Sequence, residues 1–149
     1  MTNEEFKEIM KLDKVFEEEQ IELPGKNESG IFNIDSLTTN DKFYLDVDRR
    51  GRIELTRCKM QERLVKTKLP LVRIDIDSPP HMNPDGSGVG RNHIHIYREE
   101  EFDTGNLPWA YELEGFAGIK INDFQDFMDI FYVFCNYCNI KTNNVQGVM

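Results

Sequence analysis

A stripe of apolar residues repeats at helical spacing near the N-terminus and predicts a helix over residues 3–19. The stripe consists of Phe6, Ile9, Met10, Val15 and Phe16. At the start of this segment, Thr2 and Glu5 stand three residues apart and match a capping box, in which each side chain accepts a hydrogen bond from the other residue's backbone N–H. Glutamates fill the remaining positions, so we expect a surface helix with one apolar face.

A second helix is predicted from Asp123 to about Cys138, with Asn122 as its N-cap and Gln125 completing a second capping box. Its apolar face is broad and rich in aromatic rings, which is typical of a helix that packs across a sheet. The face is formed by Phe124, Phe127, Met128, Phe131, Phe134, Cys135 and Cys138. The polar tail after Asn139 is expected to fray.

Between the two helices, apolar and polar residues alternate with the period of β-strands. Residues 20–40 contain several turn formers and predict short strands joined by turns. The longer expected strands are a hairpin of 43–47 and 53–55 around a turn at 49–51, then 71–77, 93–98 and a short piece at 109–113. Helix, antiparallel strands and helix together predict a single α+β domain over residues 1–149, with an antiparallel sheet, an N-terminal helix and an aromatic-rich C-terminal helix packed on the sheet.

The charge of the chain narrows the classes of partner. Acidic residues outnumber basic ones by 27 to 18, which gives a net charge of −9. A protein that binds nucleic acid directly needs a basic face, so this balance favours a basic protein partner or plain solubility. No apolar run approaches the roughly 18 residues of a membrane span, and the acidic N-terminus does not match a signal peptide.

The number of cysteines indicates the redox state of the compartment. An odd count of three favours a reduced, cytoplasmic protein over a disulfide framework. Cys135 and Cys138 form a CxxC pair, but the pair lies late in an apolar helix and has no second CxxC. We therefore expect these residues to fill the core.

The strands on either side of residues 78–92 place polar side chains on a shared face. Along the first strand, Asp75 and Asp77 alternate with apolar residues, and along the second, His93 and His95 do so. If the two strands are neighbours, both apolar faces must meet the core, so the polar faces must coincide. The sequence therefore predicts two imidazoles beside two carboxylates.

A third histidine, His81, lies in the intervening loop. Three imidazoles and a carboxylate suit zinc, so we predict one Zn²⁺ bound by His81, His93 and His95, with Asp77 or Asp75 as fourth ligand. The alternative is an arrangement in which the imidazoles hydrogen-bond to aspartate without a metal. A structural and a catalytic ion both remain open at this point.

The charged residues around this cluster can be assigned two alternative roles. Arg73, Arg91 and Arg98 could hold phosphate charge, but we expect them mainly to pair with neighbouring carboxylates. An acidic run follows, formed by Glu99, Glu100, Glu101 and Asp103. Such runs are usually solvated surface, and the sharper hypothesis is a partner-binding patch that imitates nucleic-acid phosphates on a basic groove.

The segments LVRIDIDSPPHMNPDG, NHIHIYREE and PWAYEL resemble a family of small uncharacterised proteins of prophages and other mobile elements, over roughly residues 70–114. Members carry a PHxNPDG loop, an HIHIYRE strand and a WAYxL segment, and they usually read REG where this chain has Arg98-Glu99-Glu100. The resemblance extends to phage-borne anti-CRISPR inhibitors of Cas9-type effectors, some of which bind metal. A looser similarity links the R-x-D…P-H…H-x-H layout to toxin-like proteins. These implications rest on resemblance alone.

Two functions follow as hypotheses. The first is a non-enzymatic, zinc-binding anti-CRISPR inhibitor in the host bacterial cytosol, which binds a basic nucleic-acid-processing protein such as Cas9. The second is a metal-dependent nuclease or toxin-like phosphodiesterase that uses the His/Asp cluster. The net charge of −9 favours the first, because a nuclease has to attract a polyanion.

Overall fold

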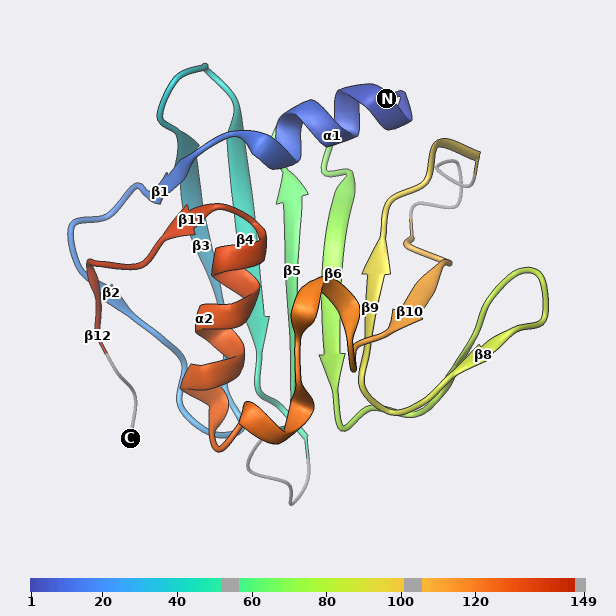
Figure 1. Cartoon of the computed structure of the whole chain (residues 1–149). Helices are drawn as coiled ribbons and strands as arrows, with labels where there is room; N and C mark the ends of the chain where they lie inside the picture. Colours follow the sequence, from blue (N-terminus) through green and yellow to red (C-terminus); the bar gives the residue numbers. More distant parts are fainter. Residues whose placement is uncertain (52–56, 101–105, 147–149) are drawn as a thin grey trace.

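A sheet of eight strands forms the frame of the molecule, with α2 lying across one face and α1 crossing one end (Figure 1). This structure is a computed structural model, and it describes residues 1–51, 57–100 and 106–146. From edge to edge the strands are ordered β10, β9, β6, β5, β4, β3, β1 and β11. Neighbours are antiparallel except β1 and β11, which are parallel. The predicted α+β class is confirmed.

The elements have the following bounds in chain order: α1 (Asn3–Lys11), β1 (Lys14–Phe16), β2 (Ile21–Glu22), β3 (Ser29–Ser36), β4 (Lys42–Asp48), β5 (Cys58–Leu64), β6 (Pro70–Ile76), β7 (His81–Met82), β8 (Gly88–Val89), β9 (His93–Ile96), β10 (Ala110–Glu112), the 3₁₀ turns η2 (Phe116–Gly118) and η3 (Ile121–Asp123), α2 (Phe127–Tyr137), β11 (Ile140–Lys141) and β12 (Val145–Gln146). Outside the main sheet, β12 pairs with β2 and β7 with β8. The second pair shapes the segment that precedes β9.

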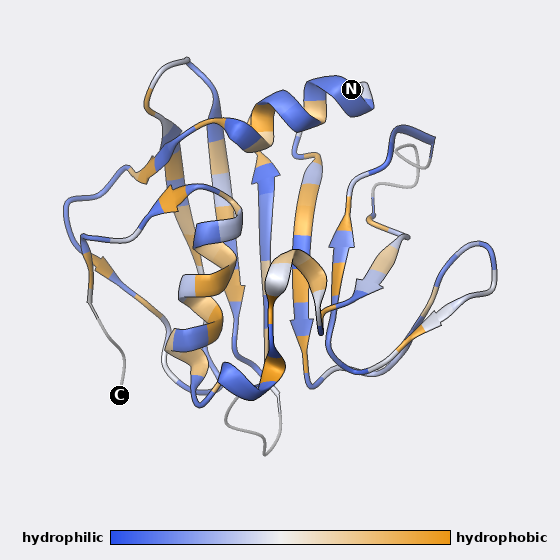
Figure 2. Cartoon of the chain, viewed as in Figure 1, coloured by the Kyte–Doolittle hydropathy of each residue, from blue (hydrophilic) through white to orange (hydrophobic). Residues whose placement is uncertain are grey.

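Alternation along the central strands separates a core face from a polar face (Figure 2). In β4, Phe43, Leu45 and Val47 are fully buried, while Tyr44 and Asp46 between them are half-buried. The apolar face packs against α2, whose Phe127, Phe131 and Phe134 belong to the same core cluster. An aromatic-rich helix on the sheet is therefore confirmed.

The first helix is shorter than predicted. The capping box of Thr2 and Glu5 is present, but α1 ends at Lys11 and Leu12 has extended backbone angles. The prediction of a helix to residue 19 is wrong, because residues 14–16 form β1 between β3 and β11. Pairing on both sides satisfies the backbone groups of this strand and buries Phe16, which outweighs the helical spacing of its apolar residues.

The last helix starts later than predicted. It begins at Phe127 and its capping box joins Asp126 to Asp129, so the assignment of Asn122 and Gln125 to this role is wrong. Residues 121–123 form η3 instead, and Phe124 after it has extended backbone angles. The observed capping box is the one adjacent to the buried Phe127.

The predicted hairpin has a different return strand. Ile53 and Leu55, which were expected to form it, lie outside the described residues, and the described partner of β4 is β5. Cys58 is the first residue of β5. The pattern of β5 was hard to recognise because a buried glutamate, Glu62, occupies its core face beside Met60.

Glu62 is part of a charged pair inside the core. Lys14 from β1 and Glu62 from β5 are both 0% exposed, with 3.3 Å between Lys14 Nζ and Glu62 Oε1. Lys14 Nζ also donates to the carbonyl oxygen of Cys138 at 2.8 Å and lies 4.8 Å from the centre of the Phe43 ring. Burial raises the pKa of Glu62 to about 7, and the contact with Lys14 only partly offsets this.

Cys135 and Cys138 fill the core, as predicted, and Cys58 is buried as well. Cys58, Cys135 and Cys138 are buried and free. Burial raises the pKa of the Cys58 thiol to about 12 and that of both helical thiols well above the ordinary value, so they are poor nucleophiles and poor metal ligands. Among the described residues, no helix has the length and apolar character needed to cross a membrane.

Candidate metal centre

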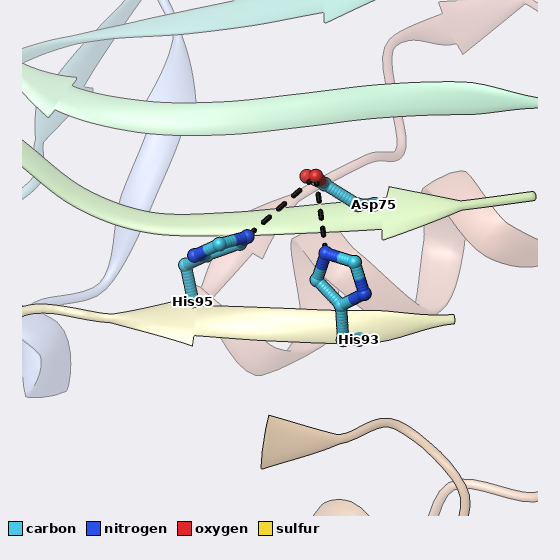
Figure 3. A group of neighbouring side chains, drawn as sticks. All are labelled: Asp75, His93 and His95. Atoms are coloured by element: carbon cyan, nitrogen blue, oxygen red, sulfur yellow. Dashed lines mark ion pairs between the residues drawn. The ribbon is translucent and has the colours of Figure 1, made fainter. Parts of the chain in front are cut away.

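The two strands that carry the polar motif are neighbours, as predicted. β6 and β9 pair antiparallel, with Asp75 opposite His93 and Arg73 opposite His95. These four residues alternate with Ile74 and other apolar positions that belong to the core, so their side chains share the polar face of the sheet. Figure 3 shows Asp75 on β6 facing His93 and His95 on β9.

Three ligand atoms converge in this place. His93 Nε2 lies 3.3 Å and His95 Nε2 lies 3.6 Å from Asp75 Oδ2. The candidate ligand atoms all lie within 4.8 Å of one another. Each of the three side chains is 4% exposed or less. A buried carboxylate and two buried imidazoles at such distances form a group that can hold a metal ion.

Backbone carbonyls fix the orientation of both imidazole rings. His93 Nδ1–H donates to the carbonyl oxygen of Gly90 at 2.7 Å, and His95 Nδ1–H donates to that of Leu107 at 2.7 Å. A carbonyl oxygen only accepts, so Nδ1 carries a hydrogen in each ring. In both residues Nε2 is therefore the atom directed at Asp75. Metal-binding histidines are typically held in this way, with one ring nitrogen anchored and the other presented to the ion.

The electrostatics of the group follow from burial and from the contacts. Burial alone raises the pKa of Asp75, but the neighbouring His93, His95 and the Arg73 cation outweigh it and hold that pKa well below its usual range. Burial lowers the pKa of His93, yet the contact with Asp75 and the Gly90 carbonyl raise it overall. Burial and the Arg73 charge together leave the pKa of His95 lowered. The shifts thus favour the charged carboxylate of Asp75 and the neutral ring of His95.

Arg73 occupies the position beside this group. Its Nε donates to Asp75 Oδ1 at 2.8 Å, and its Nη2 lies 3.3 Å from Asp75 Oδ2. The same Nη2 lies 3.0 Å from His95 Nε2. A guanidinium only donates, so His95 Nε2 is the acceptor in this contact. The prediction that Arg73 pairs with a carboxylate is confirmed, and its contact with His95 is an addition that the sequence did not indicate.

The other two arginines of the motif have different partners. Arg98 lies 3.8 Å from the centre of the Trp109 ring and donates to the Tyr111 hydroxyl at 2.6 Å. Arg91 donates to the carbonyl oxygens of Asp77 and Ser78. Both therefore secure loops and strand ends near the centre.

Of the remaining predicted ligands, His81 lies beside the group and Asp77 follows the end of β6. The ring centre of His81 is 4.7 Å from that of His95 and 5.9 Å from that of His93. Its Nε2 is 2.7 Å from the carbonyl oxygen of Pro108, to which it donates. Asp77 follows the end of β6 with a φ of 54°, so the alternation along the strand stops before it. The three atoms that converge come from Asp75, His93 and His95.

Asn83, which sequence reasoning missed, holds the preceding loop against β10. Its side chain donates to the carbonyl oxygen of Ala110 at 3.0 Å and accepts from the N–H of Ala110 at 2.8 Å. Asn83 is buried, so these bonds lie out of water. The residue belongs to the PHMNPDG segment, and its position between histidine and proline was the available signal. The loop that carries His81 is therefore held against β10, beside the group formed by Asp75, His93 and His95.

The acidic run contacts the first helix. The Glu99 carboxylate accepts from the backbone N–H of Asn3 at 3.0 Å, and the Glu100 carboxylate accepts from its side-chain amide at 3.3 Å. Both glutamates are exposed. Glu101 and Asp103 lie outside the described residues. Half of the predicted partner-binding patch is thus placed at the N-terminus of α1, where a negative charge also favours the helix dipole.

Comparisons with known proteins identify a family whose function is unknown. Nothing in a search of curated proteins or of solved structures matches the chain. One family model matches residues 1–140, which include both helices and every residue of the centre. The chain therefore belongs to the Family of unknown function (DUF6978).

Proposed function

We propose that this protein is a zinc-binding protein that acts by binding a partner rather than by catalytic turnover. The observation that carries the proposal is the convergence of two anchored imidazole nitrogens on the buried carboxylate of Asp75. In this proposal the ion links β6 to β9. Through the carbonyls of Gly90 and Leu107 it also fixes the segments on either side of β9. Metal that binds only the folded chain adds to its stability.

Zinc is the ion that the donor set favours. Two imidazole nitrogens argue against magnesium and calcium, which take oxygen ligands. Zinc accepts nitrogen and carboxylate oxygen together and prefers four ligands. Two histidines and a carboxylate also suit Fe(II), and elemental analysis distinguishes the two metals.

The proposed partner is a basic, nucleic-acid-processing host protein such as a Cas9-type effector. Support for this step comes from the net charge of −9 and from the resemblance of residues 70–114 to mobile-element proteins. Glu99 and Glu100 supply exposed negative charge at the start of α1. Binding that depends on such charges weakens steeply with salt.

A second candidate function is metal-dependent phosphodiester hydrolysis. One observation favours it, because Arg73 lies 3.0 Å from His95 and could hold a phosphate beside the ion. The near-complete burial of Asp75, His93 and His95 argues against it, since a polymer backbone has to reach the ion. Incubating the metal-loaded chain with RNA and DNA, and repeating the assay with His95→Ala, separates the two candidates.

Elemental analysis of untagged protein tests the metal. We expect about one zinc ion per chain for the wild type and little for Asp75→Asn, because three ligands are the least that a zinc site keeps. Asp46→Asn is the matched control, since Asp46 lies on the same face and also accepts two bonds from an arginine, Arg63. Wild-type protein without zinc, or equal zinc in both variants, would contradict the proposal.

The partner is tested by binding a purified Cas9-type effector at low and high salt. Glu99→Gln combined with Glu100→Gln removes two charges but keeps an oxygen that can accept from Asn3, so α1 should stay capped. We expect weaker binding of this double variant at low salt and a smaller difference at high salt. Equal binding at both salt concentrations would exclude Glu99 and Glu100 from the interface.

A further inference from the structure

We propose that the metal centre binds a dianionic phosphate group, held between the ion and the guanidinium of Arg73. This inference rests on the proposed function and names a ligand for the same site. It starts from one geometric fact, that Arg73 Nη2 already contacts two of the atoms that the ion needs, Asp75 Oδ2 and His95 Nε2.

The first step is that Arg73 and a metal ion compete for the same lone pair, on His95 Nε2. An imidazole nitrogen that carries no hydrogen has a single lone pair, and His95 Nε2 uses it to accept from Arg73 Nη2 at 3.0 Å. A bound metal takes this lone pair. Arg73 therefore loses its acceptor on His95 when the ion binds, and at least one guanidinium N–H next to the ion needs a new partner.

The second step is the charge of the loaded site. A divalent ion, the Asp75 carboxylate, the Arg73 guanidinium and two neutral imidazoles sum to two positive charges. The cross-strand neighbours Lys59, opposite Asp75, and Glu112, opposite His93, have opposite charges and cancel. Positive charge in a buried place is costly unless an anion compensates it. A dianion matches this excess, whereas a monoanion leaves half of it.

The third step is shape and access. The planar fork of arginine fits phosphate oxygens two at a time, and zinc with three protein ligands keeps a position open for an exogenous oxygen. The Arg73 side chain is 29% exposed, while the three ligands beside it are 4% exposed or less. Arg73 is therefore the side chain of this group that solvent reaches most readily. A phosphate group that arrives from solvent meets the guanidinium before it meets the ion.

The sheet offers a matched control for this role. On the same face, Arg63 donates to both oxygens of Asp46, at 2.6 Å and 3.0 Å, much as Arg73 does to Asp75. Arg63 stacks over Tyr44 and contacts no histidine among its described interactions. A variant of Arg63 thus removes a similar ion pair from the same face and leaves the metal ligands untouched.

The experiment uses protein in which Co²⁺ replaces zinc, because Co²⁺ gives a visible absorption spectrum that reports its ligands. Inorganic phosphate is titrated into wild type, Arg73→Gln, Arg73→Lys and Arg63→Gln. We expect a saturable spectral change in wild type and Arg63→Gln. Half-saturation should need about 10- to 100-fold more phosphate in Arg73→Gln, the loss expected for hydrogen bonds between charged groups. Arg73→Lys, which keeps the charge without the fork, should fall between them.

Two further arms test the steps separately. Acetate and dimethyl phosphate, both monoanions, should bind more weakly than inorganic phosphate, and equal binding would overturn the charge argument. Without phosphate, Arg73→Gln should bind Co²⁺ at least as tightly as wild type, because the positively charged guanidinium that contacts His95 Nε2 and repels the cation is gone. Weaker Co²⁺ binding by this variant would overturn the lone-pair argument.

Failure of this inference differs from failure of the proposed function. A wild-type Co²⁺ spectrum that phosphate does not change, or equal phosphate binding by wild type and Arg73→Gln, overturns the phosphate site and leaves the metal centre standing. A wild type that gives no Co²⁺ spectrum at all, as expected for Asp75→Asn, overturns both.

Discussion

Two groups of buried charges lie on opposite faces of the same sheet, and only one of them has the geometry of a site. On the core face, Lys14 and Glu62 form a pair that is 0% exposed. On the polar face, Asp75 faces His93 and His95 at 4% exposure or less. Both groups are removed from water, so burial of charge does not distinguish them.

The two groups differ in whether the atoms that could bind a cation are directed at a common point. Lys14 directs its donors at Glu62 Oε1 and at the Cys138 carbonyl, which leaves no cluster of acceptors around a common point. His93 and His95 are anchored through Nδ1, and both Nε2 atoms are directed at a carboxylate. The core pair is a contact between two opposite charges, in which Glu62 Oε2 has no hydrogen-bond partner among the described residues. The polar-face group is arranged around a position that a cation can fill.

The largest expected effect comes from breaking the core pair. Glu62→Ala removes the carboxylate that Lys14 contacts and leaves the ammonium without its ion-pair partner in the core. We expect the free energy of unfolding at pH 8 to fall by about 3–5 kcal/mol, measured by urea denaturation. The control is Lys14→Met combined with Glu62→Leu, which should be close to wild type or more stable. A loss in the double variant as large as in Glu62→Ala would show that volume, not charge, dominates.

The next effect in size concerns the polar-face group. Zinc at about 100 times its dissociation constant should raise the free energy of unfolding by about 2.7 kcal/mol, and excess chelator should abolish the gain. Asp75→Asn should show no gain, whereas Glu62→Gln on the core face should keep it in full. A gain that survives in Asp75→Asn would place the ion elsewhere. Urea denaturation with and without zinc is the measurement.

A smaller effect concerns the pH dependence of the free energy of unfolding, to which Glu62 in the core pair contributes. Because the pKa of Glu62 is about 7 in the fold against 4.5 when unperturbed, the folded chain holds a proton there that the unfolded chain releases. Stability from this residue is therefore greatest below about pH 4.5 and declines as the pH rises to about 7. Between pH 5 and 7, we expect wild type to lose about 2 kcal/mol more than Glu62→Gln. Parallel pH profiles of the two proteins would show that Glu62 titrates normally.

The same comparison explains what the sequence could predict. The facing of Asp75 and His93 was predictable, because the apolar faces of two neighbouring strands have to meet the core and this fixes which polar residues coincide. It was not predictable that Asp75 rather than Asp77 joins the group, because this depends on the positive φ of Asp77, which ends the alternation of side chains along β6. The Leu107 carbonyl that anchors His95 has no side-chain signal at all. Lys14 and Glu62 were missed because charged residues in a strand pattern usually indicate a solvent face.

The smallest expected effect comes from the second arginine–aspartate pair of the polar face, Arg63 and Asp46. Asp46 is 25% exposed, against 4% for Asp75, so water screens the Arg63–Asp46 pair more than the Arg73–Asp75 pair even though its contacts are short. We expect Arg63→Gln to cost at most about 1 kcal/mol of unfolding free energy, and to leave zinc binding unchanged. Arg73→Gln in metal-free protein should cost more, because Asp75 beside it is only 4% exposed and loses its guanidinium partner. Urea denaturation of the two variants in chelator tests this. Equal losses would mean that the two arginine–aspartate pairs are energetically alike and that only the neighbouring histidines distinguish them.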